Sequence, residues 1–154
     1  MGVVRFVYLL ALAVWVGEIV FFSFVGAPTI FAVLERTRAG DVTSAIFPRY
    51  YALAVACGAV AVVGAFLLGR GAVRPGLWRT AVVALLLGLG ATLWAARVVQ
   101  PRAAALRAAM HAAPADAPVR LEFGRLHRTA VLLNAGALVA GLVALGASAG
   151  ALRQ

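Results

Sequence analysis

The stretch FVYLLALAVWVGEIVFFSFVGA, residues 6–27, carries a single charged side chain, Glu18, in an otherwise apolar run. A helix of this length rises about 1.5 Å per residue and can cross the roughly 30 Å of hydrocarbon in a bilayer. A carboxylate near the centre of such a helix costs roughly 2.5 to 3.5 kcal/mol on insertion scales, so it usually faces other helices or a wet cavity. The run therefore predicts a membrane helix that turns Glu18 toward the interior of a bundle.

Three further apolar runs of similar length follow at residues 51–69, 77–96 and 129–149. The chain is 64% hydrophobic and 12% charged, with a mean hydropathy of +1.00, whereas about a quarter of the residues in soluble domains are charged. We therefore predict an all-α integral membrane four-helix bundle, in which residues 1–154 form one domain surrounded by the lipid bilayer. The inner, cytoplasmic membrane is the expected location if the source is bacterial.

The connections between these runs predict short amphipathic helices at the membrane surface. Residues 30–37 should extend the first helix along the interface until Ala39-Gly40 breaks it, and Asp41 should then cap the next helix. Residues 102–111 have the pattern of an Ala-rich surface helix, which residues 113–118 should break.

Three prolines predict where the helices bend. Pro28 ends the first run, Pro48 lies just inside the start of the second membrane helix, and Pro101 follows the third run. The small residues before Pro28 also resemble a signal-peptide cleavage site. We interpret the first run as a retained span, because it is longer than a signal-peptide core and contains a carboxylate.

All fourteen basic side chains are Arg, and the formal net charge is +9. We interpret the absence of Lys as a coding bias rather than a nucleic-acid site, and we expect the Arg side chains to reach toward anionic headgroups. An even number of spans places both termini and the 70–79 turn on one side, with Arg5, Arg70, Arg74, Arg79 and Arg153. The other side holds the remaining nine: Arg36, Arg38, Arg49, Arg97, Arg102, Arg107, Arg120, Arg125 and Arg128. The excess favours the second side as cytoplasmic, unless several of these Arg serve a polar site inside the bundle.

Helical spacing gathers polar side chains on one face of the fourth run. Phe123, His127, Ala130 and Asn134 return to the same side after steps of four, three and four residues. Glu18 should lie at a depth comparable to that of Asn134, counted from the same end of the bundle. This arrangement predicts a polar pocket between the helices.

Side chains from the other helices are expected to complete the pocket. Arg97 is the expected counter-ion of Glu18, with Arg49 as the second choice, and Tyr50 and Cys57 should form the wall from the second span. A purely structural interpretation also exists, because a buried Glu18–Arg97 pair would fix helix register. Asn134 would in that case serve only to join helices by a hydrogen bond.

The pocket supports three hypotheses about function. The leading one is a membrane protein that binds or moves a small solute, a proton or a metal ion. The alternative is a non-catalytic structural or assembly subunit, in which the Glu18 pair only fixes packing and residues 102–111 meet a partner. The third, a metal- or haem-dependent redox protein, is short of ligands because His111 and His127 are the only histidines. With no catalytic motif, we expect no enzyme activity, no metal site and no cofactor, and we leave homo-oligomer formation open.

Several short motifs are spread over most of the chain: Trp15-Val16-Gly17-Glu18 with Phe21-Phe22, Ala27-Pro28 with Phe31, Ala39-Gly40, Phe47-Pro48-Arg49-Tyr50-Tyr51, Pro101-Arg102, and Phe123 with Leu126-His127 and Asn134. In these motifs the sequence resembles the transmembrane protein 205-like family, a four-helix integral membrane domain. The most specific are Phe-Pro-x-Tyr-Tyr and the Leu-His pair whose His lies seven residues before Asn. The resemblance implies four spans and transfers no reaction, because none is established for that family.

Overall fold

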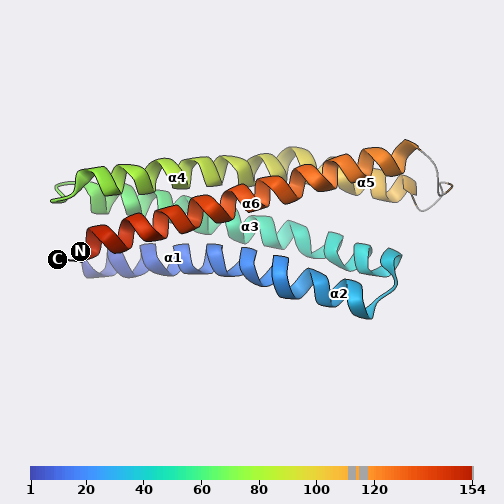
Figure 1. The fold of residues 1–154 in the computed structure, drawn as a ribbon, viewed down its shortest axis with the longest axis horizontal. Coiled ribbons are helices and arrows are strands. Elements are labelled where there is room, and N and C mark those ends of the chain that lie inside the picture. The colour runs from blue at the N-terminus through green and yellow to red at the C-terminus, as the bar shows by residue number, and fades with distance from the viewer. Residues whose placement is uncertain (111–113, 115–117, 154) are drawn as a thin grey trace.

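The chain forms one elongated bundle of long helices in the computed structural model, which describes residues 1–110, 114 and 118–153 (Figure 1). His111 and most of the breaker expected at 113–118 therefore lie outside the described residues. The elements are α1 (Gly2–Phe21), the π-helical turn η1 (Phe22–Gly26), α2 (Ala27–Val33), α3 (Arg36–Gly69), α4 (Pro75–Trp94), the π-helical turn η2 (Ala95–Val99), α5 (Gln100–Met110) and α6 (Pro118–Leu152).

Four helical stretches are long and apolar enough to cross a membrane: Gly2–Val33, Arg36–Gly69, Pro75–Met110 and Pro118–Leu152. This confirms the predicted all-α four-helix bundle and makes the protein a multi-pass membrane protein. The helices are longer than the predicted spans, since α3 alone has 34 residues and so rises about 51 Å. They therefore continue beyond the roughly 30 Å of hydrocarbon.

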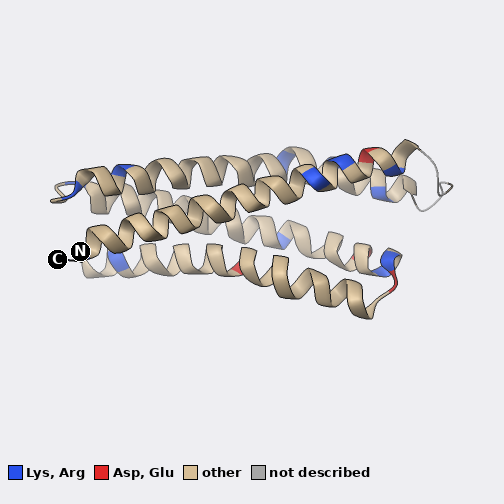
Figure 2. Ribbon diagram, viewed as in Figure 1, with Lys and Arg blue, Asp and Glu red and all other residues tan. Residues whose placement is uncertain are grey.

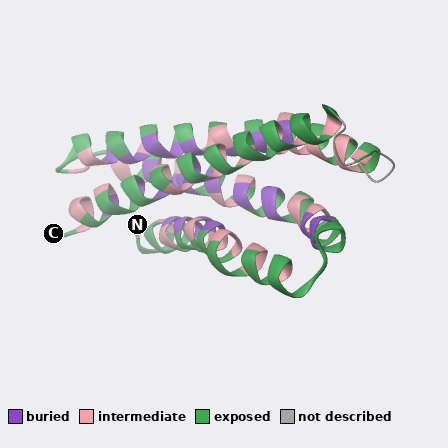
Figure 3. Ribbon diagram, turned by 45° about the vertical axis from the view of Figure 1, so that its right-hand side comes forward, coloured by how far each residue is buried: buried purple, intermediate pink, exposed green. Residues whose placement is uncertain are grey.

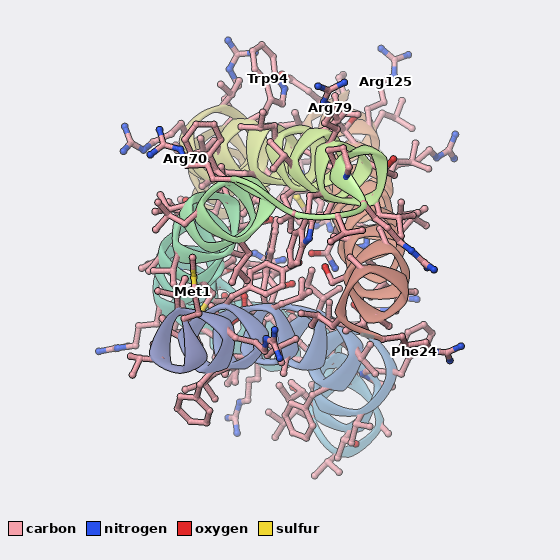
Figure 4. The ribbon with its side chains drawn as sticks, turned by 90° about the vertical axis from the view of Figure 1, so that its left-hand side faces the viewer. Met1, Phe24, Arg70, Arg79, Trp94 and Arg125 are labelled. Atoms are coloured by element: carbon pink, nitrogen blue, oxygen red, sulfur yellow. The ribbon has the colours of Figure 1, made fainter. Side chains whose placement is uncertain are left out.

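Around the bundle axis the helices follow the order α1, α3, α4, α6 (Figure 4). Helix α6 packs along α4 and α1 packs against α3, whereas the contact between α1 and α6 is much less extensive. At the end that holds both termini and the α3–α4 turn, the hydroxyls of Tyr8 and Ser148 share a hydrogen bond that joins α1 to α6. At the opposite end α2 diverges from α6 (Figures 1 and 3).

The core lies where the inward faces of the helices meet, as the buried residues in Figure 3 show. Trp15 of α1 is only 1% exposed, and its ring lies between α3 and α4. A Cβ atom would lie 3.3 Å from this ring at Gly58 and 3.2 Å from it at Gly88. These two glycines therefore let α3 and α4 approach the indole closely.

Both π-helical turns precede a proline by two residues. A proline lacks an N–H group, and its ring clashes with the carbonyl four residues earlier in a regular helix. The N–H of Ala27 instead bonds to the carbonyl of Phe22, and that of Gln100 bonds to that of Ala95, each five residues back. At Pro28 and Pro101, where bends were expected, the helix is thus interrupted by a π turn, a feature that commonly occurs at functional sites. Pro48 lies exposed inside α3 without ending it.

The predicted break at Ala39-Gly40 is wrong. The chain leaves helical geometry at Leu34 (φ −110°, ψ 151°) and Glu35, and α3 begins at Arg36. Ala39 and Gly40 are buried in the first turns of α3, where the guanidinium of Arg107 packs against Gly40. The small residues therefore serve a close contact between α3 and α5 rather than a turn.

Charged residues gather toward the two ends of the bundle (Figure 2), and the exposed Arg side chains bracket a belt of membrane thickness. Arg49 of α3 and Arg70 at its C-terminal end are 21 residues apart, which is a rise of about 31 Å. Arg79 of α4 and Arg97 of η2 are 18 residues apart, which is a rise of about 27 Å. Both spacings match the roughly 30 Å of hydrocarbon in a bilayer.

Candidate functional site

A cavity of about 530 Å³ lies at the end of the bundle where α2 diverges from α6. Its volume falls within the roughly 300 to 1,000 Å³ typical of small-molecule sites. The wall is formed by the end of α1 and by η1, α2, α3, η2, α5 and α6, and most of it is apolar. The polar side chains on it are Ser23, Thr43, Ser44, Tyr50, Tyr51, Gln100, Arg107, His127 and Asn134.

Four packed aromatic rings form one part of this wall. The ring centroids of Phe22 and Phe47 lie 5.6 Å apart, those of Phe47 and Tyr51 lie 5.9 Å apart, and those of Tyr50 and Tyr51 lie 5.2 Å apart. Such edge-to-face and tilted arrangements are the ones that aromatic quadrupoles favour. They join η1 to α3 and give the cavity a rigid apolar surface.

A chain of two hydrogen bonds crosses the inner part of the cavity. The hydroxyl of Tyr50 donates to Oδ1 of Asn134 at 2.7 Å, and Nδ2 of Asn134 donates to Oγ of Ser23 at 3.1 Å. These two hydrogen bonds link α3, α6 and η1. They also determine which side of the Asn134 amide carries the oxygen and which carries the nitrogen. Because these groups satisfy one another, the inner part of the cavity accepts apolar atoms without leaving the amide unpaired.

Arg107 forms the outer part of the cavity together with two rings of α6. Its guanidinium carbon lies 4.9 Å from the centroid of the Phe123 ring, and Phe123 stacks on His127 at 6.4 Å with an interplanar angle of 13°. The guanidinium also packs on the backbone at Gly40, and the charge of Asp41 acts on it. Arg107 is therefore a half-buried cation held at the cavity wall by α3 and α6.

Glu18 does not lie on the cavity wall. Both of its carboxylate oxygens are buried, and neither has a hydrogen-bond partner among the described residues. Its charge acts on Tyr50 and Cys57, which places the carboxyl group beside α3, next to the inner end of the cavity.

The predicted pairing of Glu18 with Arg97 or Arg49 is wrong, because neither carboxylate oxygen has a hydrogen-bond partner among the described residues and both arginines are exposed. Successive residues of a helix point about 100° apart. Since Tyr50 turns into the bundle, Arg49 turns away from it. Ala95 and Val99 are likewise the inward residues of η2, so Arg97 faces outward between them.

The structure brings together part of the predicted pocket. Tyr50, His127 and Asn134 line the cavity, and so do Phe123 and Ala130 from the same face of α6. Cys57 lies deeper, among the partly buried residues of the core. Sequence reasoning missed Ser23 and Arg107 as cavity residues. For Arg107, the available signal was a long cation in an Ala-rich helix that could reach the small residues Ala39 and Gly40.

The cavity wall combines an apolar surface with a few polar side chains. Among the residues that the structure describes, no three His, Cys, Asp or Glu side chains gather where a metal ion could be held. What the wall offers is an apolar surface, a self-satisfied hydrogen-bond chain at one end and a cation at the other.

The fold thus defines an all-α multi-pass membrane protein with a cavity between its helices. The chain belongs to the family described as a domain of unknown function, DUF4149, whose family model matches residues 10–112. An uncharacterized protein of Aquifex aeolicus (strain VF5) is 54% identical over 35 residues, which cover 23% of this chain and 26% of that protein. The chain therefore matches only about a quarter of that relative's length. No solved structure matches this chain.

Proposed function

We propose that this membrane protein is a non-catalytic binding protein that takes up a small, largely apolar molecule in the cavity between α2 and α6. The observation that carries the proposal is the cavity of about 530 Å³ with its aromatic wall. Of the solutes considered from the sequence, a small organic molecule is favoured over a metal ion, because the described residues lack a cluster of metal ligands. No cofactor is needed for this role.

The way into the cavity supports uptake from the bilayer. Phe24 and Val131 line the cavity and are also 68% and 52% exposed on the outside of the bundle. Figure 4 shows Phe24 at the outer surface. The cavity is thus bordered by side chains that face lipid, and a membrane-borne molecule can reach it from the side.

We further propose that the DUF4149 family, as this chain represents it, is the transmembrane protein 205-like family, with the motifs around Glu18, Tyr50 and His127 as its signature. Location in the inner membrane, for a bacterial source, is part of the same proposal. It is supported by the helical architecture, because outer-membrane proteins of bacteria are typically β-barrels.

Photolabelling with a matched pair of variants tests the binding role. A neutral diazirine-bearing dodecanol is added to phosphatidylcholine vesicles that contain the protein, and the labelled residues are mapped by mass spectrometry. We expect saturable labelling of cavity residues on α3 and α6. Ala130→Phe, which fills the cavity, should lower that labelling severalfold. Ala149→Phe, an exposed position on the same helix outside the cavity, should not.

The opposite result points to the structural alternative. If labelling spreads evenly over the lipid-facing surface and Ala130→Phe behaves like Ala149→Phe, the cavity does not bind such molecules. A role as a structural or assembly subunit would then be preferred.

A further inference from the structure

We propose that the ligand of this cavity is an anionic single-chain amphiphile whose phosphate or carboxylate headgroup is held by Arg107 and whose chain lies along the aromatic wall. This inference rests on the proposed function and names the class of molecule that the cavity takes. It is carried by the position of the cavity across the edge of the membrane and by the cation at its outer end.

The cavity crosses the edge of the hydrocarbon belt that the exposed Arg side chains bracket. Asn134 lies six residues inward from the exposed Arg128, which is about 9 Å along α6. Arg107 lies ten residues outward from the exposed Arg97, about 15 Å along η2 and α5. The hydrogen-bond chain is therefore at the depth of acyl chains, and Arg107 is at or beyond the level of the headgroups. An amphiphile in a bilayer is arranged in the same way, with its chain inside this edge and its headgroup outside it.

Arg107 has donors to offer a headgroup. A guanidinium carries five N–H donors and stays charged. A single carboxylate, such as that of nearby Asp41, accepts at most two of them in a bidentate pair. Stacking on Phe123 occupies one face of the guanidinium, and its Nη1 edge packs at Gly40, so the remaining in-plane N–H groups are the ones that can face a headgroup. A phosphate or carboxylate matches this planar set of donors.

The charge at this end of the molecule favours an anion. The sequence places nine Arg there against four acidic residues, Glu35, Asp41, Asp116 and Glu122. Clustered Arg at a membrane surface attracts anionic lipid headgroups, by about 1 kcal/mol per basic residue near the surface. The surroundings therefore add to the attraction that Arg107 exerts at the cavity.

The inner part of the cavity suits a chain. Tyr50, Asn134 and Ser23 already hydrogen-bond to one another, so an apolar chain beside them breaks no hydrogen bond. The rings of Phe22 and Phe47 offer an apolar surface beside it. An apolar chain that enters between Phe24 and Val131 would lie against these rings while its headgroup stays at Arg107.

The test compares two photoreactive probes that differ only in the headgroup, dodecyl phosphate and dodecanol, in neutral phosphatidylcholine vesicles. We expect the wild-type cavity to be half-labelled at a concentration of dodecyl phosphate about tenfold lower than that of dodecanol, as one charge-assisted hydrogen-bond set provides. Arg107→Gln should abolish this preference, so that both probes half-label the cavity at similar concentrations. The matched control is Arg102→Gln, an exposed arginine of the same helix outside the cavity, which should keep the preference.

One further variant and one competition experiment complete the test. Arg107→Lys keeps the charge and should retain part of the preference, and it serves if Arg107→Gln does not fold. Excess inorganic phosphate should not compete with dodecyl phosphate, and competition at similar concentration would identify a free-phosphate site instead.

Equal labelling of the wild type by both probes, or equal loss of preference in Arg102→Gln and Arg107→Gln, overturns the headgroup assignment while the cavity remains a binding site. No cavity labelling by either probe overturns the proposed function itself.

Discussion

Glu18 has both carboxylate oxygens buried, with no hydrogen-bond partner among the described residues. Replacing it by Gln therefore either removes an uncompensated buried charge or exchanges one neutral group for another of the same shape. We expect Glu18→Gln to leave the free energy of unfolding unchanged within about 0.5 kcal/mol or to raise it. Reversible unfolding in mixed micelles, followed by Trp fluorescence, measures this difference.

Glu122→Gln is the control for the same chemical change, because Glu122 is exposed on α6. Breaking a buried ion pair by removing one partner typically costs about 3 to 5 kcal/mol. A loss of that size in Glu18→Gln, but not in Glu122→Gln, would show that Glu18 is paired with an arginine after all.

For single residues, the sequence predicted which side chains share a face of one helix. It did not predict which side chains of other helices they contact. Asn134 and His127 share a face of α6 because helical geometry alone puts them there. Arg97 and Arg49 were expected in the pocket because of their level along the bundle, but level does not determine the direction of a side chain. That direction depends on how each helix is rotated by its packing, which turned Tyr50 inward and Arg49 outward.

Among the helices, glycines mark where backbones approach most closely. At Gly64 of α3, an added Cβ atom would lie 2.9 Å from Cβ of Tyr8 on α1. This atom cannot move without its backbone, so we expect Gly64→Ala to lower the free energy of unfolding by about 1 to 3 kcal/mol, as overpacking generally does. At Gly90 of α4, nothing lies within 4 Å of the added atom. Gly90→Ala should therefore raise stability by up to about 1 kcal/mol through its better helix propensity.

The test is the free energy of unfolding of Gly64→Ala and Gly90→Ala, measured under the same conditions. If both lose stability equally, glycine at these positions reflects a general requirement of the membrane helices rather than the contact between α1 and α3.

Element boundaries were predictable where the cause was local. Pro28 and Pro101 indicated bends, since a proline disturbs the helix before it in any surroundings. That each bend is a π turn, and that α3 continues through Ala39 and Gly40, could not be read locally. The contact at Gly40 comes from Arg107, on a helix far along the chain.

For the whole molecule, the structure supports one orientation in the membrane, with the cavity end on the cytoplasmic side. Nine Arg lie on the cavity side of the molecule and five on the side of the termini. The count favours the cavity side as cytoplasmic, but it would lose force if several of the nine served an internal site. Among the described residues only Arg107 lines the cavity, whereas Arg49, Arg97 and most of the others are exposed. Eight arginines therefore remain against five, and we expect the cavity to open toward the cytoplasmic leaflet.

Labelling of single cysteines tests this orientation. The native Cys57 is replaced by Ala, and a cysteine is introduced either at Val73, which is 79% exposed in the α3–α4 turn, or at Ala109, which is exposed on α5 at the cavity end. A membrane-impermeant maleimide added to intact spheroplasts should label Val73→Cys at once and Ala109→Cys only after permeabilisation. The reverse pattern would place the cavity in the outer leaflet, where the positive-inside bias does not apply. Anionic lipids are concentrated in the cytoplasmic leaflet, so the expected result would also put Arg107 where anionic amphiphiles are most abundant.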